Sequence, residues 1–205
     1  MKQSSNQANR AHLRKQLRHK RRSLSPAQQK VASLKLANHL FANQQIRRAQ
    51  RIAVYLAGDG EIDPKVFAQQ ARKRRKQIYL PSLHPVRKGH LWFGRLEGKR
   101  KKNGFGIWEP SPRYEAMRLS HQLDVVLMPL VGFDSSGARL GMGGGFYDRT
   151  FAFKQVHPTA KPCLMGLAHH FQQVDRLPIE PWDVPLTAII TDQKQHLIKR
   201  NVGSV

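Results

Sequence analysis

Residues 124–131 read Asp-Val-Val-Leu-Met-Pro-Leu-Val, a run that is mostly apolar on both faces of an extended chain. Strands of this kind are typical of the centre of a parallel sheet, which helices cover on both sides. Outward from this run, short β-branched or apolar segments predict further strands at residues 52–56, 78–80, 91–96, 163–168 and 186–191. Because these strands alternate with predicted helices, the sequence indicates a layered α/β domain with right-handed crossovers.

The N-terminal region predicts two helices. Residues 1–9 are polar and without periodicity, so we expect a frayed N-terminal lead-in. Residues 10–22 predict a basic helix with a narrow apolar stripe at Leu13 and Leu17. Ser25-Pro-Ala-Gln28 is typical of a helix start, with Ser25 as the N-cap. The buried face of this second helix is expected to consist of Val31, Leu34, Leu36, Leu40 and Phe41.

Length and composition are those of one globular domain, which we expect to span residues 1–205. The chain is long enough for one well-buried core, and no internal repeat divides it. No apolar stretch approaches the roughly 20 residues that a membrane helix needs, and the polar, basic start does not look like a secretory signal. The lone Cys163 excludes an internal disulfide framework and is expected to be a buried, inert thiol. These features predict a cytoplasmic monomer that does not enter membranes.

The charge of the chain is far from ordinary. It has 36 Lys and Arg against 13 Asp and Glu, which gives a net charge of +23. Such a balance predicts attraction to polyanions, including phosphorylated and polyglutamylated small molecules and, non-specifically, nucleic acid. A dedicated RNA- or DNA-binding protein is an alternative, since residues 10–22 could follow a phosphate backbone. Against that alternative, no RRM, KH, zinc-finger or helix-turn-helix pattern is present, and few aromatic residues interleave with the basic runs.

The sequence Arg139-Leu-Gly-Met-Gly-Gly-Gly-Phe-Tyr-Asp148 follows the central strand, where ligands gather in open α/β sheets. Its glycines leave backbone N–H groups unshielded, and the predicted helix start beyond them adds positive dipole, so the segment suits a phosphate. Arg139 supplies a cation, and Asp148 supplies a hard oxygen ligand for Mg²⁺. The spacing matches neither the P-loop nor the dinucleotide fingerprint. On its glycine content alone, a tight turn is the alternative interpretation.

This segment, preceded by Met128-Pro-Leu-Val-Gly-Phe-Asp134, resembles the signature of the 5-formyltetrahydrofolate cyclo-ligase family, also called methenyltetrahydrofolate synthetases. Weaker motifs follow in the family's order: Arg21-Arg-x-Leu-Ser25, Tyr55-Leu56 with Glu61-Ile62, Phe105-Gly-Ile-x-Glu-Pro110 and Leu177-Pro-x-Glu-x-x-Asp183. The resemblance covers most of the chain. It implies a three-layer α/β/α sandwich with a mostly parallel sheet and Rossmann-like topology.

The resemblance also implies an ATP-dependent ligase that converts 5-formyltetrahydrofolate into 5,10-methenyltetrahydrofolate, with ATP and a reduced folate, including polyglutamylated forms, as its partners. The formyl oxygen takes the γ-phosphoryl group of ATP, the neighbouring nitrogen attacks the imidate phosphate, and ADP and phosphate leave. Phosphoryl transfer needs mainly positioning and charge neutralisation, so arginines, a glycine loop and Mg²⁺ are sufficient equipment.

The sites implied by the resemblance map onto particular positions. For ATP they are Arg10, Ala11, His12, Leu13, Arg14, Arg139, Leu140, Gly141, Met142, Gly143, Gly144, Gly145, Phe146 and Tyr147, of which Arg139 and Tyr147 are expected to be catalytic. For the folate substrate they are Leu56, Glu61, Phe105, Met142, Gly143, Gly144, Gly145 and Phe146. The positions that the resemblance implies as Mg²⁺ ligands are Asp148 and Asp183.

Five positions depart from the family pattern: Arg10 replaces a common lysine, Met142 and Phe146 replace frequent tyrosines, Trp182 replaces a histidine, and Leu186 replaces an acidic residue. None of these changes removes a charged group that the reaction requires. A relative that binds nucleotide without turnover is therefore the less favoured alternative.

Two of the implied site residues also have a purely structural interpretation. Glu61 could simply favour the N-terminus of the helix that follows it. Asp183, flanked by prolines, could be a turn residue.

Overall fold

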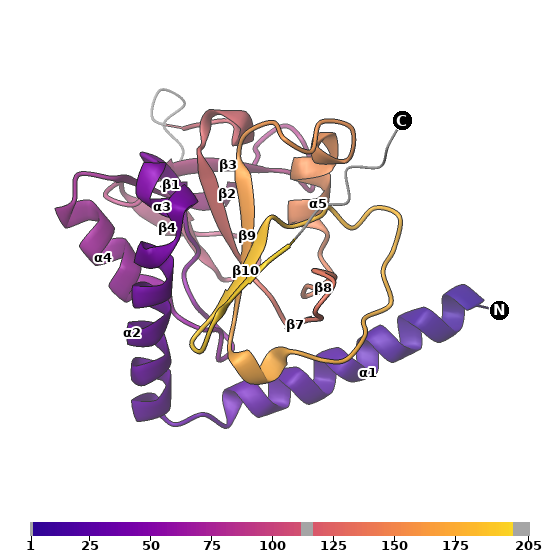
Figure 1. Cartoon of the computed structure of the whole chain (residues 1–205). Helices are drawn as coiled ribbons and strands as arrows, with labels where there is room; N and C mark the ends of the chain where they lie inside the picture. Colours follow the sequence, from indigo (N-terminus) through magenta and orange to yellow (C-terminus); the bar gives the residue numbers. More distant parts are fainter. Residues whose placement is uncertain (1, 112–116, 199–205) are drawn as a thin grey trace.

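The computed structural model describes residues 2–111 and 117–198 (Figure 1). Within them, one sheet has seven strands in the order β11-β10-β9-β6-β1-β2-β3. Strands β10, β9, β6, β1 and β2 are parallel, and β3 and β11 pair antiparallel at the two edges. Their bounds are β1 Arg51–Ala53, β2 Gln77–Leu83, β3 Leu91–Arg95, β6 Val125–Pro129, β9 Cys163–Ala168, β10 Ala188–Thr191 and β11 Gln195–Leu197. The predicted α/β class with a mostly parallel sheet is confirmed.

Helices cover both faces of the sheet, which gives three layers (Figure 1). The helices α2 (Pro26–Ala42), α3 (Gln44–Arg48) and α4 (Lys65–Lys73) lie on one side. The helix α5 (Phe146–Phe151) and the 3-10 helix η3 (Ala152–Gln155) lie on the other. Alternation along β1 matches this arrangement, because Ile52 packs in the cluster with α2 and α4 whereas Ala53 packs in the cluster with Phe151.

The run at 124–131 lies in the middle of the molecule, as predicted. Its regular part, β6, pairs with β1 on one side and β9 on the other, and residues 125–128 are at most 1% exposed. Beyond Pro129 the chain leaves the ladder gradually: the Leu130 N–H donates to the carbonyl of Leu167, and the Val131 N–H donates to the carbonyl of Leu140. The loops that follow β6 therefore begin at the carboxyl end of the strand.

The first helix, α1, spans Lys2–Arg22. It therefore begins before residue 10, where the sequence predicted the start of the helix. Helix growth is cooperative once a docked segment nucleates it, and Gln, Asn and Ser do not break a helix. The docked part is the predicted one, because Leu17 packs against Val131, Leu140 and Leu177. In Figure 1, α1 runs across one end of the sheet with its N-terminus extending outward.

The second helix begins as predicted but buries a different face. Ser25 Oγ accepts from the Gln28 N–H, and Gln28 Oε1 accepts from the Ser25 N–H. Val31 and Leu34, expected in the core, are about half exposed, at 50% and 45%. Small side chains are buried instead, because α2 lies close to the segment before α4. There Ser33 Oγ donates to the Asp63 carbonyl at 2.6 Å. The buried residues are Ala32, Ser33, Leu36, Ala37 and Leu40.

Two hairpins were not predicted, and both border the site. Strand β4 (Arg100–Lys102) pairs with β5 (Trp108–Pro110), and β7 (Gly132–Phe133) pairs with β8 (Arg139–Leu140). The remaining short elements are the 3-10 helices η2 (Ser120–Gln122) and η4 (His170–Gln172). Cys163 opens β9 and is half-buried against the core. Across the residues described, no helix is both long and apolar enough to cross a membrane.

Candidate functional site

A cleft of about 740 Å³ lies at the carboxyl ends of the central strands, where open α/β sheets bind ligands. Its walls are α1, the segment that follows β1, the carboxyl-terminal parts of β2 and β6, the β4–β5 hairpin, residues 180–183 and residues 141–145, here called the glycine loop. The predicted residues that line it are Arg10, Arg14, Leu56, Glu61, Phe105, Arg139, Gly141, Met142, Gly143, Gly144, Gly145, Phe146, Tyr147, Asp148 and Asp183. Segments far apart in the sequence thus meet in one site.

Four residues of the predicted ATP site lie outside this cleft. Ala11 and His12 are exposed on α1, and Leu13 is half-buried beside the buried Leu140. Helix geometry explains the split along α1, because residues 10 and 14 share one face of the helix and the three between them point elsewhere. The N-terminal contribution to the cleft is therefore one face of α1, with Arg10, Arg14 and the unpredicted Gln7, rather than a continuous segment.

The glycine loop has a backbone that side chains would strain. Gly143 and Gly145 have φ angles of +99° and +65°, in the left-handed region that favours glycine. Arg14 Nε donates to the Gly141 carbonyl at 2.8 Å, and Arg149 Nη2 donates to the Gly144 carbonyl at 2.5 Å. These bonds occupy carbonyls and fix the loop from both sides. The exposed N–H groups of the loop then suit an anion.

Two ion pairs lie in the part of the cleft that Arg10, Arg139, Asp148 and Asp183 line. Arg10 Nη1 lies 2.9 Å from Asp183 Oδ2 and also donates to the Pro178 carbonyl. Arg139 is 7% exposed and donates to Asp148 Oδ1 and to the Val184 carbonyl. Burial lowers the pKa of Arg139, and the carboxylates of Asp148 and Asp183 oppose that shift. Both carboxylates predicted as metal ligands are therefore already held by arginines.

Arg14 adds a third cation to this part of the cleft. Burial, and then the neighbouring Arg10, lower the pKa of Arg14. A guanidinium stays protonated in proteins in spite of such shifts. Three arginines beside a glycine loop would therefore gain from a polyanionic ligand that offsets their mutual repulsion.

Two tyrosines also line the cleft. Tyr147 stacks on Phe151, with ring centroids 6.4 Å apart and planes 15° from parallel. Burial, reinforced by Glu61, raises the pKa of Tyr147, so its hydroxyl stays protonated and can donate a hydrogen bond. Tyr55 was not among the predicted residues, and its hydroxyl donates to the Ile62 carbonyl at 2.6 Å. That bond fixes the loop that carries Glu61.

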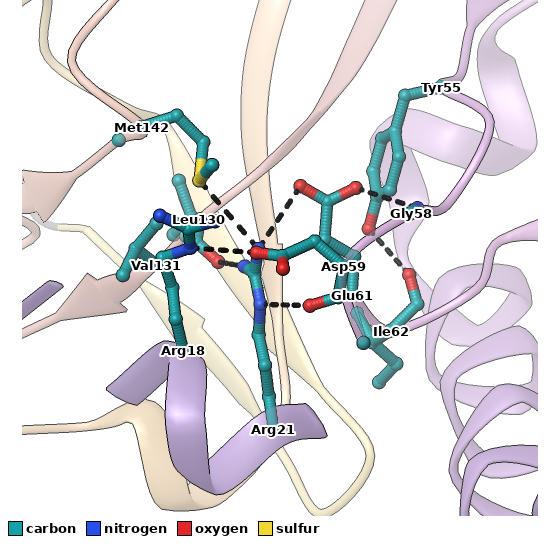
Figure 2. Close-up of polar contacts among 12 residues, drawn as sticks. Arg18, Arg21, Tyr55, Gly58, Asp59, Glu61, Ile62, Leu130, Val131 and Met142 are labelled. Atoms are coloured by element: carbon teal, nitrogen blue, oxygen red, sulfur yellow. Dashed lines mark hydrogen bonds and ion pairs between the residues drawn. The ribbon is translucent and has the colours of Figure 1, made fainter. Parts of the chain in front are cut away.

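Glu61 sits in the loop after β1, and Figure 2 shows its surroundings. Its Oε2 accepts from the Gly58 N–H at 3.2 Å, and its Oε1 lies 3.7 Å from Arg21 Nη2. Burial raises the pKa of Glu61, while the Gly58 N–H and the Arg21 charge oppose that shift. The interpretation of Glu61 as a simple helix-start residue is insufficient, because its side chain turns into the cleft lining.

Aromatic residues at the mouth of the cleft were only partly predicted. Phe105 is 67% exposed and meets Phe146 edge-on, with centroids 5.8 Å apart. Ile107, Trp108 and Trp182 also line the cleft and are more than half exposed. Exposed large apolar groups beside a pocket suit a flat aromatic ligand. Trp108 lies within the motif at residues 105–110, but the exposure of its side chain depends on the β4–β5 hairpin, which was not predicted.

The departures from the family pattern have clear places. Met142 is about half exposed, and its sulfur lies 3.7 Å from Arg21 Nη2. Leu186 is 1% exposed in the core, so an acidic side chain would not suit that position in this chain. Over the residues described, no three His, Cys, Asp or Glu side chains gather as a metal site.

Comparison with known proteins identifies the family. A sequence model described as the 5-formyltetrahydrofolate cyclo-ligase family matches residues 6–192. The chain belongs to this family. It is 41% identical to the 5-formyltetrahydrofolate cyclo-ligase of Haemophilus influenzae over 187 residues, covering 90% of this chain and 98% of the relative. It is 39% identical to the Escherichia coli K12 protein of the same name, covering 87% and 97%.

Solved structures agree with the family assignment. The chain matches the 5,10-methenyltetrahydrofolate synthetase of Aquifex aeolicus with a TM-score of 0.78 and 27% identity, over 96% of each chain. It matches the corresponding synthetase of Mycoplasma pneumoniae with a TM-score of 0.69 and 27% identity, over 89% of this chain and 98% of that one. The likeness therefore extends over the whole fold that carries the cleft.

Proposed function

We propose that the protein catalyses the ATP-dependent cyclisation of 5-formyltetrahydrofolate to 5,10-methenyltetrahydrofolate, with release of ADP and phosphate. Family membership supports the overall reaction. The observation that carries the assignment of ATP and folate to this cleft is that its lining combines two groups of residues, here called the cationic end and the aromatic end. Three arginines and the glycine loop form the first, and Phe105, Trp108 and Glu61 belong to the second.

ATP would bind at the cationic end. The N–H groups of the glycine loop and the guanidinium groups of Arg10, Arg14 and Arg139 would contact its phosphate oxygens. These donors are held in advance by protein contacts, so little reorganisation is needed on binding. An accumulation of positive charge also lowers the energy of the phosphoryl group as it is transferred.

The reduced folate would bind at the aromatic end. Phe105 offers a ring for stacked or edge contact with the flat pterin, Leu56 offers apolar surface, and the Glu61 carboxylate can accept hydrogen bonds from ring N–H groups. The positive charge of the chain favours acidic folates, including polyglutamylated ones.

The proposed reaction has two steps, activation of the formyl oxygen by phosphorylation and then ring closure. An amide oxygen is a poor leaving group until it carries phosphate, so the formyl oxygen first attacks the γ-phosphorus and ADP departs. The neighbouring amine nitrogen then attacks the activated carbon, loses its proton and expels phosphate. Arg139 would stabilise charge on the phosphoryl oxygens, and the protonated Tyr147 hydroxyl would donate a hydrogen bond to them.

The donor set fits Mg²⁺ held together with ATP. The described hydrogen bonds to Asp148 both end on Oδ1, which leaves Oδ2 as an oxygen ligand. Asp183 is the second candidate, in competition with Arg10. Magnesium commonly takes one or two protein carboxylates and completes its shell with phosphate oxygens and water, and when bound it would neutralise phosphate charge.

The deciding experiment incubates pure protein with ATP, Mg²⁺ and 5-formyltetrahydrofolate. The product contains a conjugated amidinium and absorbs at longer wavelength than the substrate, so turnover is followed directly and matched to ADP formed. Folded protein that gives neither signal would overturn the proposal. ATP binding without turnover would instead favour the nucleotide-binding alternative.

A matched pair of variants tests whether ATP binds at the cationic end. Arg14→Gln should weaken ATP binding about tenfold, the loss expected for one charged hydrogen bond. Arg72→Gln removes the same charge from an exposed pair with Glu97 and should leave ATP binding unchanged.

A further inference from the structure

Arg21, in the last turn of α1, is a fully buried cation behind the proposed folate end of the cleft (Figure 2). Its Nε donates to the Asp59 carbonyl at 2.7 Å, and its Nη2 donates to Asp59 Oδ2 at 2.5 Å. Its Nη1 reaches the Leu130 carbonyl at 3.4 Å, beyond the end of β6. A buried cation is retained only when its donors are satisfied, and this one joins α1, the loop after β1 and the end of β6.

The loop at residues 58–61 is built around this arginine. Asp59 and Gly60 have φ angles of +52° and +75°. A Cβ at Gly60 would lie 2.6 Å from the Arg21 carbonyl oxygen, so the loop can approach α1 this closely only with glycine there. The Gln29 side-chain amide donates to the Gly60 carbonyl at 3.0 Å and completes the attachment.

The two acidic residues of the loop depend on Arg21 to different degrees. Asp59 also accepts from Arg18 and Arg22, so it keeps two cationic partners if Arg21 is lost. For the Glu61 carboxylate, Arg21 is the only cationic group within 4.0 Å in the part of the chain that the structure describes. Removing the Arg21 charge would therefore leave Glu61 without a cation within 4.0 Å among the described residues, whereas Asp59 would keep two.

We propose that Arg21 is a positioning residue that fixes the Glu61 carboxylate against the bound folate. This inference rests on the proposed role of Glu61 in folate binding. The titratable groups around Glu61 are Arg18 and Arg21 on α1, Asp59 in its own loop, and the two tyrosines Tyr55 and Tyr147. Burial, the largest influence, already raises the pKa of Glu61, so loss of the nearest cation should raise it further.

The first test needs no ligand. Protein isotope-labelled at its glutamate carboxyl carbons is titrated by NMR, and the spectrum of Glu61→Gln assigns the Glu61 signal. Arg21→Met should move the Glu61 midpoint to higher pH. Arg22→Met is the matched control, because it removes an arginine from the same Asp59 without touching Glu61, and it should leave the midpoint in place.

The second test measures binding at equilibrium. For Arg21→Met we expect about a tenfold rise in the Kd for 5-formyltetrahydrofolate at neutral pH, a larger rise at lower pH, and an ATP Kd within twofold of wild type. If Arg21 acts through Glu61, the double variant with Glu61→Gln should bind folate no worse than Glu61→Gln alone. Arg21→Lys keeps the charge but loses the fork, so it should restore the Glu61 midpoint and part of the affinity.

The outcomes separate this inference from the proposed function. Wild-type protein that binds no folate would refute the proposed function, while the ligand-free titration would still decide whether Arg21 governs Glu61. An unchanged Glu61 midpoint in folded Arg21→Met would overturn the inference. So would equal losses of folate and ATP affinity, which indicate general disruption. If Arg21→Met does not fold, Arg21→Gln takes its place, and an unchanged Glu61 midpoint in that variant would likewise overturn the inference.

Discussion

Arg10 and Asp183 form an ion pair across 173 residues of sequence, with Nη1 2.9 Å from Oδ2 and Nη2 3.4 Å from Oδ1. The pair ties the first helix to the segment that precedes β10. Asp183 Oδ2 also accepts from the Glu180 N–H, and Arg10 also donates to the Pro178 carbonyl. Asp183 therefore belongs to a closed turn, as its structural interpretation predicts, and its carboxylate also lines the cleft beside Arg10.

Asp148→Asn and Asp183→Asn are predicted to lower turnover severely, each on the order of 100-fold, if both carboxylates serve one Mg²⁺. Asparagine keeps the size of the side chain but removes a negative charge and an anionic ligand. Raising Mg²⁺ should restore part of the rate. Because both residues would act on one ion, the double variant should be less impaired than the product of the single effects. Steady-state rates against Mg²⁺ concentration measure all three.

The ion pair with Arg10 leads to an alternative outcome, in which Asp183 has a structural role and does not bind Mg²⁺. An Asp183→Asn variant that keeps nearly wild-type rates at limiting Mg²⁺ but melts at lower temperature would assign Asp183 to structure alone. Its loss of stability should be on the order of 1–3 kcal/mol, because Arg10 would be left buried without its counter-ion. Asp175→Asn, on an exposed acid, controls for the change in net charge.

Gly144→Val is predicted to abolish turnover while leaving the fold intact. Gly144 is exposed and has no positive φ, so a side chain there strains no backbone. Its Cβ would meet the Phe146 ring at 3.0 Å, and we expect the larger side chain to obstruct the approach of phosphate to the backbone of the loop. Gly144→Ala should lose less activity, since one methyl group obstructs less. The check is the ATP Kd together with the melting temperature, and a Val variant with wild-type ATP affinity would contradict the prediction.

The net charge of +23 predicts non-specific nucleic-acid binding that weakens steeply with salt. Neutralising about four phosphates would lower the affinity about 100-fold between about 50 and 200 mM salt, because the released counter-ions must be bound again. Titration of unrelated duplexes and single strands should give similar affinities. A strongly preferred sequence at physiological salt would instead support the nucleic-acid-binding alternative.

The fold was largely predictable because its signals are local. The run at 124–131 is too apolar for an exposed strand, and Ser25 with Gln28 can form a capping box wherever the helix packs. The face that α2 buries was not predictable, because it depends on which side of the helix packs against α4 and the sheet, and Val31 and Leu34 lie on the side that stays exposed. Likewise, residues 2–9 join α1 through helix cooperativity rather than through any pattern of their own.

The site was predictable residue by residue but not contact by contact. The glycine segment and the family motifs located most of the cleft lining. They could not reveal that the proposed metal ligands are paired with Arg139 and Arg10, since those bonds join distant segments. Arg21 gave only a weak signal, a basic residue in a basic helix, although burial and four hydrogen bonds distinguish it in the structure.

Asp59 gives the clearest pH dependence. Burial alone would raise its pKa, but hydrogen bonds from Arg18, Arg22 and Arg21 outweigh burial and lower it. A lowered pKa means that the folded state binds this proton more weakly than the unfolded state. The stabilisation is therefore present above the ordinary value of 3.8 and is lost as the pH falls below it.

Asp59→Asn should accordingly lower the free energy of unfolding by about 1.5–3 kcal/mol at neutral pH, the range for hydrogen bonds to charged groups. Asparagine tolerates the positive φ at this position, so the backbone itself is not the cause of the loss. The difference between variant and wild type should shrink below about pH 4, where the wild-type carboxylate begins to be protonated in the unfolded chain. Urea unfolding at a series of pH values measures it, with Asp175→Asn as the exposed control. A difference that stays constant across that range would show that Asp59 acts through its shape and not through its charge.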